Sequence, residues 1–278
     1  MKLLTLLSSA ALGTLLLFSG SVQMTSCTKE TRTDTLVVRD TVSLPCNCSA
    51  RDLVAHYTFT NGSLKDSSGQ DNHITFSNAT LVADRFGNPN GAFKFNGTNN
   101  YMSVPNSPSL NPGYAITLMA TVKLDGLYTG ACHANQILGK SYGDNVQGYY
   151  ALRVTDYLDC HVPIDPSKMI FSGDYGDNER YQPSIPPLTS DTMKVKLDKW
   201  YTVAFTYANG KGCMYVNGEL KKTETGPIEF TANKYDLHIG NSQQEQYPYW
   251  FNGVIDEIRI YSSALTAEEV KEISNCGK

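Results

Sequence analysis

The stretch Phe251-Asn252-Gly253-Val254-Ile255-Asp256-Glu257-Ile258-Arg259-Ile260-Tyr261, near the end of the chain, has the pattern of a β-strand. Most of its residues are β-branched or aromatic, and charged Glu257 and Arg259 alternate with apolar neighbours. Asp256 breaks this alternation, because it follows two apolar residues in the part of the strand that should be covered. A buried carboxylate needs a cation, an arginine or several donors. A strand-end Asp wetted by solvent or bonded to nearby backbone N–H groups is the alternative.

Similar patterns recur along the chain, separated by Asn-Gly and other glycine or proline turn signals. They lie at 53–59, 92–97, 101–104, 115–123, 136–140, 148–154, 199–207, 212–220 and 236–240. The pair 199–207 and 212–220 forms a predicted hairpin across Asn209-Gly210. About twelve short strands at regular intervals predict an all-β protein, a two-sheet antiparallel sandwich.

Two segments depart from the strand pattern. After the last strand, Thr266 can cap the Glu269 amide while Glu269 reaches back, and Leu265 and Val270 can form a hydrophobic staple. This predicts a short C-terminal helix ending near Ser274. Residues 155–192 carry five prolines and no regular spacing, so we expect an elaborated loop with a short strand at 169–171.

The net charge argues against a nucleic-acid partner, and the N-terminal segment predicts export. The formal charge is −4 with 18% charged residues, so there is no basic excess for nucleic acid. Residues 1–26 have Lys2 followed by a broken apolar stretch that is too short to span a membrane, as in a signal peptide. Residues 27–50 are polar and predict a tether, and residues 51–278 form the sandwich domain.

The end of the signal peptide predicts the location of the protein. Met24-Thr25-Ser26-Cys27 resembles a bacterial lipobox, with Cys27 as the lipidated first mature residue. The resemblance implies a lipoprotein of the cell envelope, attached to the outer membrane through lipid alone, either periplasmic or surface-exposed. An ordinary secretory signal cleaved nearby is the alternative.

The mature chain keeps an even number of cysteines: Cys46, Cys48, Cys132, Cys160, Cys213 and Cys276. An even number in an exported protein predicts disulfides, of which Cys132 with Cys160 is the preferred pair. Cys276 could pair with Cys46 or Cys48, because domain termini often lie close together. Cys132-His133 and Cys160-His161 also offer a zinc ligand set, although adjacent Cys-His lacks the usual spacing.

Several stretches resemble, in order, the laminin G-like, concanavalin A-like jelly-roll domains of bacteria. They are the opening strand 53–59, the polar loop Asp66-Ser67-Ser68-Gly69 with Asn72-His73, the F-x-F-x-G stretch 93–97 with Tyr101, the hairpin 200–204 with 215–218, and 251–261. The resemblance covers residues 52–275. It implies a jelly-roll sandwich with a short C-terminal helix.

The resemblance also implies a structural calcium ion on the sandwich. Asp256 would be one ligand, and Asp66, Asp71 and Asn72 in the polar loop would complete the site. Ca²⁺ takes carboxylate, carbonyl and water oxygens, which fits this set. For Asp66 the alternative is an Asx-turn that only shapes the loop.

The acidic residues do not favour an enzyme. Sandwich glycosidases place two carboxylates about 5 to 9 Å apart, and the related glucanases carry them on alternate residues of one strand. No such run occurs here, and adjacent Asp256 and Glu257 should point to opposite faces of a strand. We expect a non-catalytic binding module for a glycan or a surface protein, with a glycoside hydrolase as the less favoured alternative.

The ligand site is predicted from aromatic and amide side chains that could stack on a sugar ring. Gln246, Tyr247, Tyr249 and Trp250 form the best local group. Tyr142 and Tyr175 come next, because loops at one end of a sandwich can converge. The alternative for Trp250 is packing at the sandwich edge beside Phe251.

Overall fold

The computed structural model describes residues 51–130, 132–140, 148–156, 162–176, 188–189, 194–226 and 231–276, with only the backbone at 188–189. The predictions for Cys27, Tyr142 and Cys160 lie outside these residues. In the part of the chain that is described, no helix is long and apolar enough to cross a membrane.

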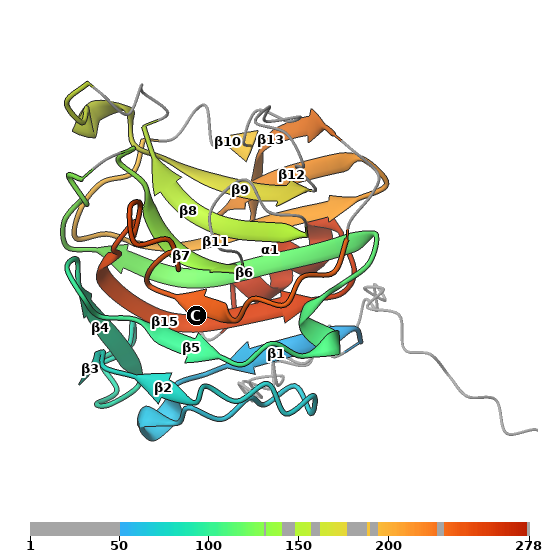
Figure 1. The fold of residues 1–278 in the computed structure, drawn as a ribbon, viewed down its shortest axis with the longest axis horizontal. Helices are drawn as coiled ribbons and strands as arrows, with labels where there is room; N and C mark the ends of the chain where they lie inside the picture. The colour runs from blue at the N-terminus through green and yellow to red at the C-terminus, as the bar shows by residue number, and fades with distance from the viewer. Residues whose placement is uncertain are drawn as a thin grey trace, which may run out of the picture. The chain divides into compact units, whose positions relative to one another are not determined.

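The strands form two antiparallel sheets, which confirms the two-sheet sandwich (Figure 1). The eight-stranded sheet has the order β13-β12-β11-β6-β15-β4-β3, and β1 also pairs with β15. Its strands are β1 (Leu53–Tyr57), β3 (Thr80–Val82), β4 (Ala92–Asn96), β6 (Ala115–Leu124), β11 (Trp200–Ala208), β12 (Lys211–Val216), β13 (Glu219–Thr225) and β15 (Asn252–Tyr261).

The seven-stranded sheet has the order β10-β9-β8-β7-β14-β5-β2. Its strands are β2 (Phe76–Ser77), β5 (Met102–Val104), β7 (Asn135–Lys140), β8 (Tyr149–Thr155), β9 (Ile170–Gly176), β10 (Leu188–Thr189) and β14 (Leu237–Ile239). Three short 3-10 helices interrupt the connections: η1 (Thr60–Gly62), η2 (Pro108–Leu110) and η3 (Pro166–Lys168).

The core lies between the inner faces of the two sheets. On β15, Ile255, Ile258 and Ile260 are fully buried. From the opposite sheet, the ring of Tyr175 lies 4.7 Å from that of Tyr207, measured between centroids. Such alternating strands bury one face each, which is why the period-2 pattern located most of the strands from sequence.

The closing strand β15 changes partners along its length. On one side Asn252–Ile255 pair with β4, and Ile258–Tyr261 pair with β1. On the other side it follows β6, with a bulge between Ile255 and Glu257. Asp256 is the extra residue of this bulge, so the irregularity seen in the sequence has a local backbone cause.

The bulge also corrects one expectation. Asp256 and Glu257 do not diverge to opposite faces, because both carboxylates reach Arg85: its Nη1 lies 2.7 Å from Asp256 Oδ2 and its Nη2 lies 3.4 Å from Glu257 Oε2. An extra residue in one strand resets the alternation, so neighbouring side chains can meet the same partner.

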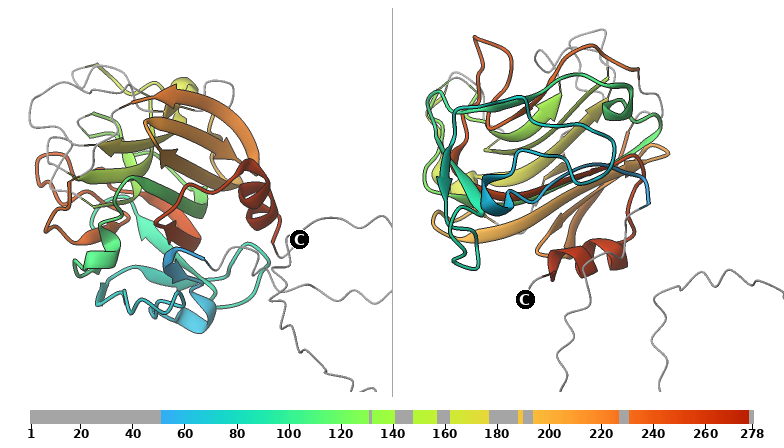
Figure 2. Two further views of the ribbon diagram at one scale, coloured as in Figure 1. Left: turned by 90° about the vertical axis from the view of Figure 1, so that its right-hand side faces the viewer. Right: turned by 90° about the horizontal axis from the view of Figure 1, so that it is seen from below.

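The predicted C-terminal helix is confirmed as α1 (Ala267–Ser274), with the full capping box between Thr266 and Glu269. Its apolar side packs on the outer face of the eight-stranded sheet (Figure 2). This second, smaller core contains Met119, Ala204, Tyr215, Tyr261, Leu265, Val270 and Ile273.

The short strand expected at 169–171 is longer than predicted, and the loop expected around it is wrong for residues 172–176. Residues 170–176 form β9, which pairs with β8 along its whole length. The segment Ser172-Gly173-Asp174 lacks the apolar content of a typical strand, because Asp174 points away from the core and pairs with Arg153 on β8 at 2.8 Å. A strand with a salt-bridged outer face is hard to recognise from composition.

Candidate functional site

Aromatic side chains gather on the outer face of the seven-stranded sheet. On β14, Leu237 and Ile239 are fully buried and His238 points the other way. The register places Ser103 of β5 beside both His238 and Phe76 of β2. Directly paired residues in an antiparallel sheet share a face, so Phe76, Ser103 and His238 form one row across three strands.

Tyr101 lies two residues before Ser103 and fills the gap in this row. Its ring centroid is 4.7 Å from that of Phe76 and 5.1 Å from that of His238, with the latter pair stacked at 20°. Trp250 joins from the segment before β15, at 6.4 Å from Tyr101. We call Phe76, Tyr101, His238 and Trp250 the aromatic patch. Phe76 is 42% exposed and the other three are half-buried.

Amide side chains border the aromatic patch. Asn78 accepts a hydrogen bond from the Tyr101 N–H through Oδ1, at 2.8 Å, and donates to the carbonyl of Asn99. Asn100 donates to the carbonyl of Asn78. On the other side, His238 Nδ1 lies 2.9 Å from Asn241 Oδ1. Burial lowers the pKa of His238, which favours the neutral imidazole in the patch.

The structure places the four binding residues predicted at 246–250 in two different surroundings. Trp250 belongs to the aromatic patch. Tyr249 is only 4% exposed, and its ring lies 5.5 Å from the Arg153 guanidinium. Tyr247 stacks on Tyr249 at 6.2 Å, and exposed Gln246 donates to the Tyr247 hydroxyl. These three residues therefore form a neighbouring cluster that packs onto β8.

Tyr175 does not reach the surface, and we remove it from the binding residues. It faces the core from β9, where its ring packs against Tyr207. Its hydroxyl donates to the carbonyl of Gly113 at 2.6 Å. The sequence favoured a loop here, and an inward position became visible only when β9 was placed in the sheet.

The predicted calcium ligands have other partners. Asp256 binds Arg85, and Asp71 has a side chain 91% exposed. The Asp66 carboxylate accepts four hydrogen bonds, from the N–H of His56, Ser68 and Asn72 and from the Ser68 hydroxyl, at 2.7 to 3.0 Å. The side-chain amide of Asn72 donates to the Val54 carbonyl.

These contacts do not fit a calcium ion. Four donors fill the lone-pair sites of a carboxylate, so Asp66 acts as the loop-shaping residue that was the alternative. Within the described ranges, no group of three or more His, Cys, Asp or Glu side chains could hold a metal.

The cysteines that the structure describes bear on the predicted disulfides and on the predicted zinc site. Cys132 and Cys276 are each disulfide-bonded, and Cys213 is a free thiol. A disulfide leaves Cys132 no thiolate to give to zinc, and adjacent His133 lies 3.2 Å from buried Asp156 instead. The pairing of Cys132 with Cys160 remains a prediction.

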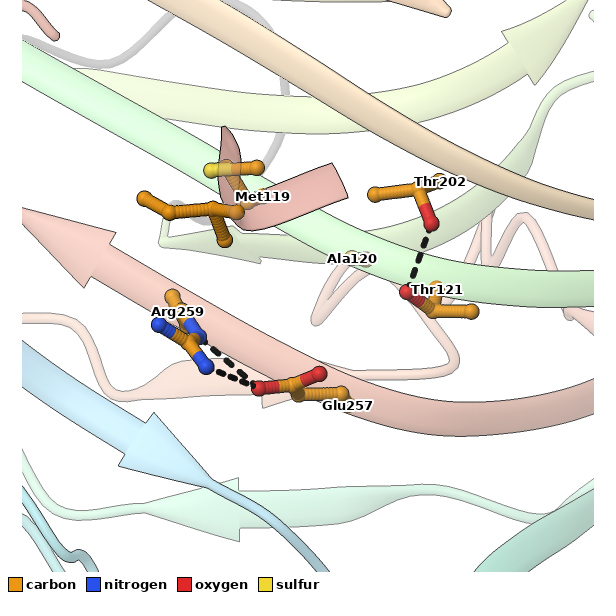
Figure 3. Close-up of a pocket in the computed structure, with 7 residues that line it drawn as sticks. Met119, Ala120, Thr121, Thr202, Glu257 and Arg259 are labelled. Carbon is orange, nitrogen blue, oxygen red and sulfur yellow. Dashed lines mark hydrogen bonds and ion pairs between the residues drawn. The ribbon is translucent and has the colours of Figure 1, made fainter. Parts of the chain in front are cut away.

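A shallow pocket opens on the outer face of the eight-stranded sheet, beside α1 (Figure 3). It has only about 10 Å³ of space for a water-sized molecule and is lined by Met119, Ala120, Thr121, Thr202, Glu257, Arg259 and Ile273. Its polar groups bond to one another: Thr121 to Thr202 at 3.0 Å and Arg259 to Glu257 at 2.7 Å. Ligand pockets usually hold about 300 Å³ or more, so this one is a weaker candidate than the aromatic patch.

Comparison with known proteins places the chain in a family. Residues 96–271 match the Laminin_G_3 family, which is described as the concanavalin A-like lectin/glucanases superfamily. The chain belongs to this family. The match covers well over half of the sequence and contains the closing strand and the hairpin of β11 and β12. No curated protein matches the sequence.

Solved structures share the fold of this concanavalin A-like domain. Domain 4 of AbnA, a GH43 extracellular arabinanase from Geobacillus stearothermophilus in complex with arabinotriose, has a TM-score of 0.54 at 23% identity, over 81% of this chain and 98% of that one. The binding domain of botulinum neurotoxin DC in complex with SialylT has a TM-score of 0.57 at 12% identity, over 82% and 51%. The Trypanosoma rangeli sialidase in complex with the inhibitor DANA has a TM-score of 0.51 at 20% identity, over 79% and 32%.

The chain spans about half the length of the toxin binding domain that it matches. At these identities the likeness shows the fold alone.

Proposed function

We propose that this concanavalin A-like domain is a non-catalytic glycan-binding module that takes its ligand on the aromatic patch. The observation that carries the proposal is the row of rings across β2, β5 and β14, with Phe76 42% exposed at its end. The C–H groups on one face of a sugar ring make dispersion contacts with an aromatic ring, and many such contacts add up. The amides of Asn78 and Asn100 beside the patch have further donor and acceptor positions for sugar hydroxyl groups.

The acidic residues support a binding role rather than hydrolysis. A glycosidase needs two carboxylates on either side of the scissile bond. Here Asp256 and Glu257 hold the same guanidinium, and Asp174 is paired with Arg153. Burial acts to raise the pKa of Glu257, but His56 and Arg259 outweigh it and lower the pKa to about 2. Such a carboxylate is a poor general acid.

Two of the similar structures are complexes with sugar ligands, arabinotriose and SialylT. They support the choice of a glycan over other ligand classes for this fold. Under the proposal Cys27 carries the lipid that holds the module at the outer membrane, where a glycan partner would meet it. Calcium has no part in the proposal, because Asp256, Asp66 and Asn72 have other partners and the Asp71 side chain is 91% exposed.

The test is a screen of the purified protein against soluble polysaccharides and a glycan array, with neutral and acidic glycans as separate sets. Phe76→Ala, Tyr101→Ala and Trp250→Ala should each weaken binding roughly tenfold or more, since about 1.4 kcal/mol of lost contact is a factor of ten. Phe86→Ala is the matched control, because Phe86 is 50% exposed in the loop between β3 and β4.

Equal loss in Phe86→Ala would show that the aromatic patch is not the site. Binding to no glycan, combined with capture of a surface protein that depends on Tyr101, would assign the patch to a protein partner instead.

A further inference from the structure

The place where β15 changes partners concentrates charge. Asp256 and Glu257 lie between the residues that pair with β4 and those that pair with β1. Their side chains are only 7% and 18% exposed. Two carboxylates removed from water at one point of a sheet need positive partners, because an unpaired buried charge is costly.

Arg85 enters this junction from the loop between β3 and β4. Besides its contacts to the two carboxylates, its backbone N–H lies 3.4 Å from Asp256 Oδ2 and its Nη2 lies 3.5 Å from the carbonyl of Cys276. One guanidinium therefore joins the β3–β4 loop, the closing strand and the segment after α1. Arginine suits this position, because its planar fork can donate to several acceptors at once.

The loop is built to hold Arg85 in place. Asp84 accepts hydrogen bonds from the N–H of Phe86 and of Asn88, each at 2.8 Å. Gly91 closes the loop where an added Cβ would come within 2.9 Å of the Asp84 side chain. The ring of Phe86 lies 4.5 Å from the Arg85 guanidinium carbon. These contacts fix the loop, so little freedom is lost when Arg85 binds the carboxylates.

The charges at the junction balance without a metal. Arg259 donates to Glu257 Oε1 through Nη2 at 2.7 Å, so two guanidiniums face two carboxylates. His56 Nε2 lies 2.9 Å from the same oxygen of Glu257. A divalent cation placed here would add two charges to a site that is already neutral, and the nearby Asp66 has no free acceptor position for it.

We infer that Arg85 is the resident cation of the closing strand and that the domain folds and keeps its stability without calcium. The inference concerns stability, so it stands apart from the proposed glycan binding. It assigns to one side chain the role that the resemblance to the family gave to a metal ion.

The first test uses the unaltered protein. Its melting temperature should be the same in excess EDTA and in millimolar CaCl₂, and elemental analysis of the purified protein should find no stoichiometric calcium. A melting temperature that falls in EDTA and recovers with Ca²⁺ would overturn the inference, whatever the glycan screen shows.

The second test removes the cation. Arg85→Gln should lower the melting temperature by roughly 10 °C, since it leaves two buried carboxylates with one fewer partner. Arg85→Lys should recover part of the loss, because a point charge cannot bridge both acceptors as the guanidinium does.

Lys94→Gln is the matched control. Lys94 on β4 pairs at 3.0 Å with Asp125, which directly follows β6, but the Lys94 side chain is 50% exposed, so little change is expected. An Arg85→Gln protein that melts with the wild type and the control would overturn the inference. Circular dichroism at low temperature checks that each variant is folded before melting.

Discussion

Lys140 carries a charge into a fully buried position on β7. Its Nζ donates to Asn111 Oδ1 at 2.9 Å, to the Asn233 carbonyl at 3.0 Å and to Asn233 Oδ1 at 2.6 Å. All three acceptors are neutral. Burial therefore lowers the pKa of Lys140 to about 8, although Asp236 acts in the opposite direction.

This pKa predicts how stability depends on pH. Between about pH 8 and the ordinary lysine value of 10.5, the unfolded chain binds more protons at Lys140 than the folded protein does. The free energy of unfolding should therefore rise with pH in this window, by up to about 1.4 kcal/mol per pH unit. Urea denaturation of the wild type and of Lys140→Met from pH 7 to 10 measures this pH dependence. The free energy of unfolding of the wild type minus that of Lys140→Met should rise with pH.

A difference between Lys140→Met and the wild type that stays flat over this pH range would show that the Lys140 ammonium is not desolvated as described. At still higher pH the buried tyrosines act in the opposite direction. Burial raises the pKa of Tyr207 to about 12, so the unfolded chain loses this proton first.

At the residue scale, the sequence predicted that Asp256 needs a partner but could not identify that partner. The break in alternation predicted a buried carboxylate with a cation, an arginine or several donors as its partner. The arginine lies 171 positions earlier in the chain, in a loop with no pattern of its own. Tyr101 and His238 were missed for the same reason, because the register that joins them is long-range.

At the scale of elements, local patterns were sufficient where one face is apolar. The strands at 92–96, 115–124 and 200–208 and the helix at 267–274 follow their predicted positions closely. Only the start of β9 was predicted, as a short strand at 169–171, because its outer face further along carries Ser172 and a salt-bridged Asp174. β13 was missed because it is a charged, exposed strand at the edge of its sheet. Such edges avoid apolar residues, so they lack the signal.

The capping box of α1 gives a prediction at this scale. Thr266 accepts a hydrogen bond from the Glu269 N–H at 3.2 Å, and Glu269 accepts one from the Thr266 N–H at 2.8 Å. Thr266→Ala should lower the free energy of unfolding by about 1 kcal/mol, because it leaves a helix N–H without its acceptor. Urea denaturation measures this, with Thr98→Ala in an exposed turn as the control. Equal stability of the two variants would mean that α1 does not depend on its cap.

At the scale of the whole domain, the inner and outer faces of the seven-stranded sheet have different tasks. The inner face makes the core, and the two sheets come especially close at Gly173 of β9, where an added Cβ would meet the ring of Phe205 from β11. The outer face carries the aromatic patch. Side chains that alternate along the same strands therefore belong either to packing or to binding.

This separation predicts opposite effects for two substitutions. Gly173→Ala should lower the free energy of unfolding by roughly 1 to 3 kcal/mol through overpacking, with glycan affinity unchanged below the melting transition. Gly113→Ala is its control, since nothing lies within 4 Å of a Cβ added there. Phe76→Ala should weaken glycan binding and change stability by no more than about 0.5 kcal/mol, because the residue is 42% exposed on an edge strand.

Calorimetric binding and urea denaturation on the same three proteins separate the two effects. If Gly173→Ala bound as weakly as Phe76→Ala at a temperature where both are folded, the two faces of the sheet would be coupled. Binding would then depend on how the sheets pack, and the aromatic patch alone would not explain it.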